Sequence, residues 1–420
     1  MTLHENDMTP EKALLVGVDL GEYDFEESLD ELGELARSAG AEVLAAVTQK
    51  KDRPDIATCV GSGRLEEISE YCSQNDVDLV IFDCELSPTQ IRNIEKATDT
   101  RTIDRTMLIL DIFANNATTS EGKLQVELAM LRYLMNRLTG KGIEMSRQGG
   151  QGGIGARRGP GESKLETDRR HIRRRVHYLK EQLDEIEKRR HLTRRRRTKE
   201  NIQTVAIVGY TNAGKSTLMN ALTDAGLLAE NKLFATLDST SRSLKLPSGR
   251  NVLLIDTVGF IRKLPHHLVE AFKSTLEDAT TADTILNICD ISSPEAHVHL
   301  EVTDKILKEL GADTDMVIPV FNKCDLAESP ELFGYPNAVK ISAAKKEGLD
   351  ALLEAVENRL PQTTKKVHLL IPFPKVAVAA KIRGEGQLIS EEYIEEGLLV
   401  EAVVPLTLLH ELEEFEVVDG

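Results

Sequence analysis

Apolar residues recur along the first third of the chain in short runs that alternate with amphipathic stretches. In chain order, the expected elements are strand 13–20, helix 25–37, strand 41–47, helix 64–73, strand 77–82 and helix 88–96. The runs are as short as buried strands, and the stretches repeat apolar residues at helical spacing. Strands that alternate with helices are typical of parallel sheets, so residues 1–123 are predicted to form an N-terminal α/β domain.

The next segment, residues 124–200, changes to a heptad period. Its first apolar stripe consists of Leu124, Leu128, Leu131, Met135 and Leu138. Its second stripe consists of Leu165, Ile172, Val176, Leu179, Leu183 and Ile186. Steps of three and four residues place each stripe along one side of a helix. Because a helix cannot bury such a stripe alone, we expect an antiparallel helical hairpin with the loop 139–161 at its tip.

Strand and helix signals return over residues 201–362. The expected strands are 202–209, 251–256, 284–290, 316–322 and 338–342. The expected helices lie near 215–223, 267–279, 295–310 and 347–359. Pro361 and the polar residues after it mark a boundary. Residues 363–420 are expected to form a small C-terminal α/β domain, so the predicted fold class is α/β with a helical arm.

Charge is distributed unevenly over these segments. The 420 residues have a formal net charge of −17, whereas residues 147–199 contain 18 Lys and Arg against 7 Asp and Glu. A basic segment on an acidic protein indicates local contact with a polyanion such as RNA. Glycines in the tip loop allow close backbone approach, and its arginines match phosphate oxygens. The alternative is a solvated helix face with a flexible tip. The run 194–199 is either a helix end favoured by the helix dipole or a hinge.

The cysteines and the N-terminus bear on where the protein works. The five cysteines form no C-x-x-C pair and no Cys/His cluster, so we expect neither disulfides nor structural zinc. The sequence has no signal peptide, no run of about 18 apolar residues and no lipidation motif. We therefore expect a cytoplasmic protein with reduced thiols, and a monomer, because nothing in the sequence demands a dimer.

The sequence GYTNAGKS at 209–216 matches the phosphate-binding pattern G-x-x-x-x-G-K-[ST]. It follows an apolar strand and precedes a helix, which is the context in which this loop binds phosphates. Backbone N–H groups of the loop and of the helix N-terminus bind phosphate oxygens. Lys215 is expected to act as the catalytic cation on the β- and γ-phosphates, and Ser216 is expected to ligate Mg²⁺.

Two later segments carry residues that would respond to the γ-phosphate. DTVG follows a predicted strand, so Asp256 is positioned to hold Mg²⁺ through water and the Gly259 N–H to contact the γ-phosphate. Thr236, in the segment LFATLDSTSR, is the candidate for the second protein oxygen on Mg²⁺, and Thr240 is its rival. The expected catalytic residues are thus Lys215, Thr236 and Gly259.

NKCD at 322–325 follows another apolar strand and identifies the base. Guanine presents two donors on one edge, and the Asp325 carboxylate accepts both, whereas adenine lacks them. Asn322 is expected to tie the base to the phosphate loop, the Lys323 stem to cover its face, and backbone N–H groups of SAA at 342–344 to contact guanine O6. The residues expected at GTP are Gly209, Tyr210, Thr211, Asn212, Ala213, Gly214, Lys215, Ser216, Thr217, Phe234, Ala235, Thr236, Leu237, Asp238, Asp256, Thr257, Val258, Gly259, Asn322, Lys323, Cys324, Asp325, Ser342, Ala343 and Ala344. We therefore expect a P-loop GTPase that converts GTP to GDP and phosphate.

Phe260 follows Gly259, at the place where many GTPases carry a glutamine that orients the attacking water. A phenyl ring cannot make that hydrogen bond. We predict slow intrinsic hydrolysis, on the order of 10⁻³ s⁻¹ or slower, with the missing group supplied by a partner that orders the switch loops. Packing of Phe260 in an apolar seam is a compatible alternative.

Together these features resemble the HflX family of translational GTPases. The resemblance covers nearly the whole chain and rests on the N-terminal domain, the loop GGQGGIGARRGPGE, and the motifs GYTNAGKS, FATLD, DTVGFI, NKCD and SAA. It implies binding to the large ribosomal subunit and GTP-dependent splitting of stalled 70S ribosomes. It also implies membership of the group with a hydrophobic residue in place of the catalytic glutamine, which Phe260 matches. Ser239 stands where the family often has proline, which leaves Thr236 unaffected.

The resemblance also implies an RNA contact. The hairpin and its loop would reach the peptidyl-transferase region of 23S rRNA, with Arg147, Arg157 and Arg158 on phosphates. Some family members hydrolyse ATP through the N-terminal domain. The glycine-rich stretch VGSGRLEEI at 60–68 is the candidate phosphate loop there, but the sequence has no complete ATP motif, and a tight turn is the alternative.

Three functions remain open at the level of sequence. The first is a GTPase switch that dissociates stalled 70S ribosomes and is stimulated by the ribosome. The second is a GTPase in ribosome assembly or RNA maturation, which would bind precursor subunits rather than mature 70S particles. The third is a constitutive RNA-binding protein with a structural nucleotide site, for which Lys215→Ala would leave RNA affinity unchanged.

Overall fold

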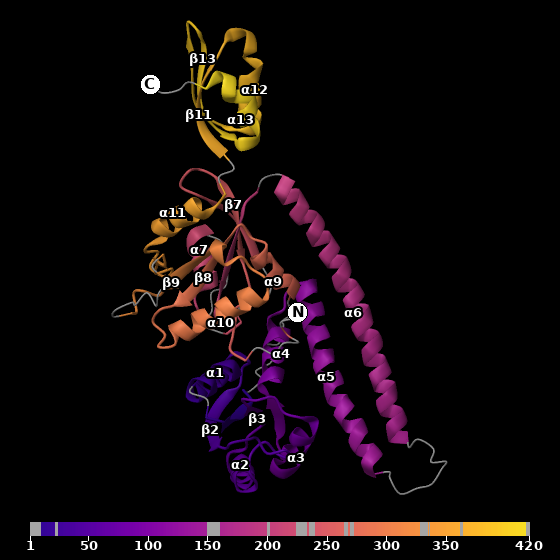
Figure 1. The fold of residues 1–420 in the computed structure, drawn as a ribbon. Helices are drawn as coiled ribbons and strands as arrows, with labels where there is room; N and C mark the ends of the chain where they lie inside the picture. Colours follow the sequence, from indigo (N-terminus) through magenta and orange to yellow (C-terminus); the bar gives the residue numbers. More distant parts are fainter. Residues whose placement is uncertain are drawn as a thin grey trace, which may run out of the picture. The chain divides into compact units, whose positions relative to one another are not determined.

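The computed structural model describes residues 10–21, 24–148, 160–199, 202–223, 233–234, 240–263, 268, 273–327, 335, 337–361 and 364–416. The chain divides into two compact units, Met1–Asn358 and Arg359–Gly420, each of which is described by itself. The first unit contains two sheets and a pair of long helices, and the second contains a small antiparallel sheet (Figure 1).

The first unit begins with a four-stranded parallel sheet in the order β2-β1-β3-β4. Its strands are β1 (Lys12–Asp19), β2 (Glu42–Lys50), β3 (Leu79–Phe82) and β4 (Arg101–Asp104). The helices are α1 (Phe25–Ser38), α2 (Ser62–Asn75), α3 (Pro88–Thr98) and α4 (Arg105–Asn116). Successive residues of β1 enter two different cores, since Leu15 belongs to the core with α1 and α4, and Val16 to the core with α2 and α3. Both faces of the sheet are buried, as is usual for parallel sheets.

The predicted strands and helices of this sheet are present, but β4 and α4 were not expected. A strand of four residues is too short to show a period. The glycine-rich stretch at 60–68 begins α2, with Gly61 as N-cap, and the Gly61 N–H donates to Gln49 Oε1 at 2.8 Å. This geometry is that of the tight turn.

Two long helices, α5 (Ser120–Gln148) and α6 (Pro160–Lys199), lie side by side as an antiparallel hairpin (Figure 1). Arg175 of α6 forms a bidentate pair with Glu127 of α5 at 2.7 Å. Helix α5 continues to Gln148, so the first part of the expected tip loop 139–161 is helical. Two glycines in this part, Gly140 and Gly142, lie within the helix and do not end it.

Helix α5 has a second buried face that the heptad period does not reveal. Val126, Ala129 and Tyr133 join the core formed with α1 and α4. The Tyr133 hydroxyl donates to Asp104 Oδ1 at 2.7 Å, and Arg137 forms an ion pair with the other Asp104 oxygen at 2.7 Å. The arm is therefore anchored at its base to the N-terminal sheet as well as to its partner helix.

The second sheet of this unit has the order β10-β9-β8-β5-β7-β6, with only β6 antiparallel to its neighbour among these strands. Its strands are β5 (Thr204–Gly209), β6 (Thr240–Lys245), β7 (Asn251–Asp256), β8 (Thr284–Asp290), β9 (Val317–Asn322) and β10 (Val339–Lys340). Its helices include α7 (Lys215–Thr223), α9 (Lys273–Thr280), α10 (Ala296–Glu309) and α11 (Leu349–Arg359). Strand β6 was not predicted from the sequence, since it is an edge strand that is mostly polar and exposed. The carboxyl ends of the parallel strands meet at one edge, where α/β sheets bind ligands.

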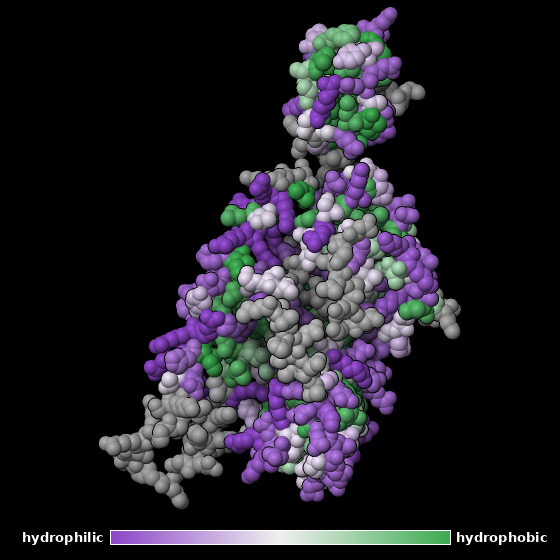
Figure 2. Space-filling model, turned by 180° about the vertical axis from the view of Figure 1, so that it is seen from behind, coloured by the Kyte–Doolittle hydropathy of each residue, from purple (hydrophilic) through white to green (hydrophobic). Residues whose placement is uncertain are grey.

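The second unit is a three-stranded antiparallel sheet in the order β11-β13-β12, with two helices on one face. Its elements are β11 (Thr364–Ile371), α12 (Ala377–Glu385), β12 (Gln387–Ile394), β13 (Gly397–Pro405) and α13 (Leu406–Leu412). Alternate residues of β13, such as Leu398 and Val400, form its core with Ile382 and Leu408 of the helices. Apolar and polar side chains are mixed on its surface (Figure 2).

Among the described residues, none of the helices combines the length and the apolar content that a membrane-spanning helix needs.

Candidate nucleotide-binding site

A glycine-rich loop joins β5 to α7 at the carboxyl edge of the second sheet. Gly209 has a φ of 148°, and a Cβ there would lie 2.2 Å from the Ile288 carbonyl oxygen of β8. Gly214 has a φ of 92°, and a Cβ there would lie 2.3 Å from Asn322 Nδ2. Both positions therefore require glycine.

Lys215 opens α7 and is buried inside this loop. Its Nζ donates to the carbonyl oxygens of Tyr210 at 2.8 Å and Gly209 at 3.2 Å. Burial lowers the pKa of Lys215 to about 8, and the nearby Asp256 carboxylate opposes that shift. The loop thus holds a cation among backbone groups, which suits a polyanionic ligand.

The next residue, Ser216, meets the end of β7. The Ser216 hydroxyl donates to Asp256 Oδ2 at 2.9 Å. Asp256 is fully buried, and burial raises its pKa. Its second oxygen, Oδ1, has no hydrogen-bond partner among the described residues. A buried carboxylate oxygen without a donor, beside a serine hydroxyl, is a set of hard oxygen atoms that fits Mg²⁺ directly or through water.

The chain after Asp256 packs against the loop. Phe260 N–H donates to the Gly209 carbonyl at 3.1 Å, and Thr211 N–H donates to the Phe260 carbonyl at 2.8 Å. A Cβ on Gly259 would lie 3.0 Å from the Thr211 Cα of the loop backbone and 2.9 Å from Lys215 Nζ, so a side chain there would force the loop to shift. The peptide at Gly259 therefore lies beside the buried ammonium group.

Phe260 is 1% exposed. It lies in an apolar cluster with Ala206, Val208, Ala279, Ile285 and Leu307. The structure thus shows Phe260 as a core residue that packs β5 against α9 and α10. Its buried side chain offers no hydrogen-bonding group.

Asn322 at the end of β9 joins the loop to the segment after β10. Its Nδ2 donates to the Ala213 carbonyl at 2.8 Å, and its Oδ1 accepts from the Ala343 N–H at 3.0 Å. Asn322 and Ser342 are buried, whereas Ala344 is exposed. The three motifs thus converge on one amide side chain.

The other residues of NKCD extend from this junction. Lys323 has a φ of 61° and pairs through Nζ with Asp290 Oδ2 at 2.6 Å. A hydrogen bond with the Ser342 side chain, together with the Lys345 ammonium at 3.5 Å, lowers the pKa of Asp325. Asp325 is therefore ionised at neutral pH and can accept hydrogen bonds from a ligand.

Some expected site residues lie away from the site, and others lie outside the described residues. Those outside the described residues are Ala235, Thr236, Leu237, Asp238, Arg157 and Arg158. Arg147 belongs to α5, but its side chain is not among those described. Phe234 packs edge-on against Phe113 of α4, with ring centroids 4.7 Å apart, and its carbonyl accepts from Asn116 Nδ2 at 2.8 Å. The Phe234 side chain is therefore part of the N-terminal core.

The sequence analysis missed a contribution of α1 to this edge. The Tyr210 hydroxyl donates to Glu31 Oε2 at 2.6 Å and accepts from the Arg262 N–H at 2.8 Å. The Tyr210 ring stacks on His299 with centroids 3.9 Å apart, and burial lowers the pKa of His299 to about 4. Glu31 also pairs with the buried Arg105 of α4. No local sequence signal connects residues so far apart in the chain.

A cavity of about 280 Å³ lies between α1 and the phosphate-binding loop. The residues that line it include Glu27, Asp30, Glu31 and Glu34 of α1 and Tyr210, Thr211, Asn212 and Ala213 of the loop. This part of the site is acidic on the side of α1. Burial raises the pKa of Glu31, although the Arg105 guanidinium and the Tyr210 hydroxyl oppose that shift.

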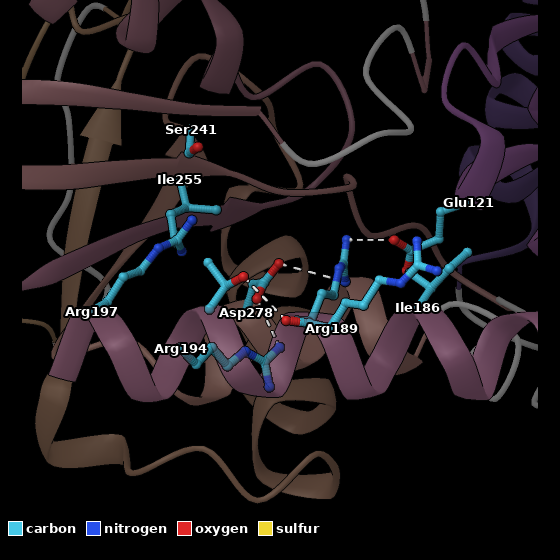
Figure 3. Close-up of a pocket in the computed structure, with 10 residues that line it drawn as sticks. Glu121, Ile186, Arg189, Arg194, Arg197, Ser241, Ile255 and Asp278 are labelled. Carbon is cyan, nitrogen blue, oxygen red and sulfur yellow. Dashed lines mark hydrogen bonds and ion pairs between the residues drawn. The ribbon is translucent and has the colours of Figure 1, made fainter. Parts of the chain in front are cut away.

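A separate pocket lies where the base of the arm meets α9 and strands β6 and β7 of the second sheet (Figure 3). Arg194 of α6 pairs with Asp278 of α9 at 2.7 Å and with Glu277 at 3.6 Å. Arg190 pairs with Glu121 of α5 at 3.1 Å and with Asp278 at 3.7 Å. The start of the basic run 194–199 is therefore fixed by carboxylates of α9.

The fold and the loop together define a P-loop domain of the GTPase class. Sequence profiles agree with this class over three segments of the chain. Residues 26–114 match the family described as GTP-binding GTPase N-terminal, 116–197 match GTP-binding GTPase Middle Region, and 204–323 match 50S ribosome-binding GTPase.

Curated relatives resemble the chain over nearly its whole length. A GTPase HflX of Caldanaerobacter subterraneus subsp. tengcongensis is 51% identical over 405 residues, which cover 96% of this chain and 94% of the relative. A GTPase HflX of Escherichia coli is 40% identical over 392 residues, which cover 92% and 91%. The chain belongs to the HflX family of GTPases, which confirms the resemblance seen in the sequence. A GTP-binding protein from Sulfolobus solfataricus, solved in complex with GDP, is 24% identical with a TM-score of 0.45 and covers 83% of this chain and 98% of its own.

Proposed function

We propose that this chain binds and hydrolyses GTP, associates with the large ribosomal subunit and dissociates stalled 70S ribosomes. The observation that carries the nucleotide part is the Asn322 side chain, which bonds both the phosphate-binding loop and the segment of Ala343. The ribosome part is supported by the family profile described as 50S ribosome-binding GTPase. Splitting of 70S particles is an expectation that rests on the family resemblance.

In this proposal the phosphates lie along the loop 209–216, with Lys215 on the β- and γ-phosphates. Its hydrogen bonds to two loop carbonyls would be exchanged for phosphate oxygens, and the positive form would then be stabilised. Ser216 and Thr236, with Asp256 through water, would hold Mg²⁺. When bound, the ion neutralises charge that develops between the β- and γ-phosphates. The Gly259 N–H would contact the γ-phosphate.

Guanine would be selected by the Asp325 carboxylate. The Ser342 hydroxyl and Lys345 favour its ionised form, which can accept from both guanine donors. Lys323 would cover the base, and the N–H groups of residues 342–344 would reach guanine O6. The other residues that the sequence predicts at GTP would also contact the nucleotide. Phe234 would do so only through its backbone.

Hydrolysis without a partner would be slow. The Phe260 ring is buried in the core, so position 260 supplies no group to orient a water molecule. We propose that the ribosome supplies or orders the missing group and so stimulates hydrolysis. The arm, with Arg147, Arg157 and Arg158 near its tip, would contact 23S rRNA. We assign the protein to the cytoplasm, where ribosomes are, and treat it as a monomer.

For the interpretation of variants we divide the chain into an N-terminal α/β domain (1–123), the helical hairpin (124–200), the GTPase domain (201–362) and a small C-terminal α/β domain (363–420). Each residue role proposed above falls within one of these segments. Variants can therefore be grouped by the domain that they change.

Co-sedimentation tests the proposal most directly. The protein is centrifuged with 70S ribosomes and with separated subunits, in a non-hydrolysable GTP analogue, in GDP and without nucleotide. We expect binding to 50S and 70S with the analogue and weak binding in the other two states, and free subunits should accumulate from 70S. Equal binding in all three states would contradict a GTP-controlled switch. Binding without subunit release would contradict the splitting activity alone.

A further inference from the structure

Two thiols are in contact at the carboxyl edge of the N-terminal sheet. Cys59 Sγ and Cys84 Sγ are 3.3 Å apart, and one thiol donates a hydrogen bond to the other. Cys84 lies two residues beyond the end of β3, and Cys59 lies just before α2. Parallel sheets commonly place their reactive groups at this edge. Among the described residues, no other pair of thiols is in hydrogen-bond contact.

The backbone holds Cys59 in a costly conformation. Its φ is 66°, in the left-handed region that residues with a Cβ rarely adopt. Two backbone hydrogen bonds between Asp55 and Cys59, of 2.8 and 3.0 Å, close the turn. From α3, the Gln90 amide donates to the Asp55 carbonyl at 2.7 Å, and the Asn93 amide donates to another carbonyl of the turn at 3.0 Å. Such strain persists only where the surroundings impose it, and here they hold the Cys59 thiol against Cys84.

The surroundings of the pair favour one negative charge but oppose two. The hydrogen bond from Cys84 lowers the pKa of Cys59, and the Lys51 ammonium acts in the same direction against the effect of burial. The same hydrogen bond, followed by burial, raises the pKa of Cys84. The negative charge therefore rests on Cys59, and the Cys84 thiol keeps its proton and donates it along the 3.3 Å contact. Cys59 is buried and Cys84 is half-buried, so solvent reaches the pair at Cys84.

We propose that Cys59 and Cys84 form a redox-active dithiol that a hydroperoxide oxidises to an intramolecular disulfide. The Cys59 thiolate attacks one peroxide oxygen, an S–O bond forms, the O–O bond breaks, and the departing oxygen takes up a proton from water. The Cys84 sulfur then attacks the sulfenic sulfur of Cys59 as its own thiol proton is given up, an S–S bond forms, the S–O bond breaks, and the hydroxide leaves as water with that proton. The two sulfurs lose two electrons and the peroxide gains them. The products are one disulfide, one alcohol or water, and one water.

The other cysteines provide internal references. Burial raises the pKa of Cys72 and raises that of Cys289 to about 12, so neither is a ready thiolate. Cys72 is also useful because it lies in the same tryptic peptide as Cys84, residues 65–92. Cys59 lies in the neighbouring tryptic peptide, residues 52–64. In a Cys72→Ser variant, Cys84 is the one cysteine left in peptide 65–92. A link to peptide 52–64 in that variant must therefore come from Cys84.

The test treats the reduced full-length protein with hydrogen peroxide, alkylates the remaining thiols and maps peptides without reduction. We expect the 52–64 and 65–92 peptides to be linked, and dithiothreitol to reverse the link. Effective concentrations within one chain reach the millimolar range, so at about 1 μM protein this link should exceed intermolecular disulfides by roughly 10³. Cys72→Ser should retain the link. Cys84→Ser should lose it and leave a Cys59 sulfenic acid that dimedone traps.

The wild-type chain alone also decides the matter if a variant folds poorly. Peroxide should lower the number of alkylatable thiols by two per chain, both of them from Cys59 and Cys84. A loss of thiols without the 59–84 link, or a link that involves Cys72 instead, would overturn the proposal. If Cys59→Ser left a Cys84 that dimedone labels readily, the order of attack would be wrong.

Discussion

Lys215 is a cation that the folded chain holds almost out of contact with water. Burial lowers its pKa to about 8 from the usual 10.5. The unfolded chain therefore binds this proton more tightly than the folded, nucleotide-free chain does. The free energy of unfolding must then rise with pH between about 8 and 10.5, and the penalty at neutral pH is at most about 3 kcal/mol.

Lys215→Met should remove this pH dependence. In urea unfolding without nucleotide, the wild type should gain about 2 kcal/mol of stability relative to the variant between about pH 7 and pH 10. The physical reason is that the buried ammonium group loses its proton in this range before the unfolded chain does. Lys308→Met, at an exposed position of α10, is the matched control and should follow the wild type. A stability difference that does not vary with pH would show that Lys215 is well solvated.

Tyr210 connects the phosphate-binding loop to α1 through one hydroxyl group. Tyr210→Phe removes the donor to Glu31 and the acceptor of the Arg262 N–H, which leaves two buried polar groups less satisfied. We expect a loss of about 1–3 kcal/mol in the free energy of unfolding. Tyr178→Phe, on an exposed stretch of α6, is the control and should change little. An unchanged midpoint for Tyr210→Phe would mean that water replaces both hydrogen bonds.

At the scale of elements, α6 is fixed to α9 by arginines that share carboxylates. Arg194→Ala should remove the pairs with Glu277 and Asp278 and loosen the end of α6. These side chains are partly buried, so we expect a loss of about 1 kcal/mol, more than an isolated surface pair contributes. Hydrogen exchange should become faster in α9 and in the last turns of α6. The neighbouring Arg195→Ala, on an exposed side of α6, should leave exchange unchanged.

Elements with a strong local pattern are predictable from sequence, and contacts between elements are not. The apolar runs of β5 and β9 and the motif at Lys215 predict the two strands and the phosphate-binding loop. The polar edge strand β6 has no such pattern, and the second buried face of α5 becomes visible only when the N-terminal core lies against it. The bond between Glu31 and Tyr210 joins residues 179 positions apart, for which a single sequence carries no signal.

For the molecule as a whole, the separation of charge predicts how RNA binding responds to salt. The segment 147–199 is basic, while the full chain carries −17, so phosphate contacts should be concentrated on the arm. Each phosphate that a lysine or arginine neutralises adds roughly 0.7–0.9 to the slope of log affinity against log salt. Replacement of Arg157 and Arg158 by Ala should therefore lower the slope for 50S binding by about 1.5.

The matched control removes the same charge from the second unit. Lys381→Ala combined with Arg383→Ala changes two exposed basic residues of α12 and leaves the arm intact. This double variant should keep the wild-type slope, because net charge acts over a distance that salt screens, whereas bound phosphates release counterions. Sedimentation across a salt series measures both variants against the wild type. Equal slopes for the arm variant and the wild type would place the RNA contact away from Arg157 and Arg158. An equal decrease of the slope in both double variants would show a general effect of net charge rather than a contact of the arm.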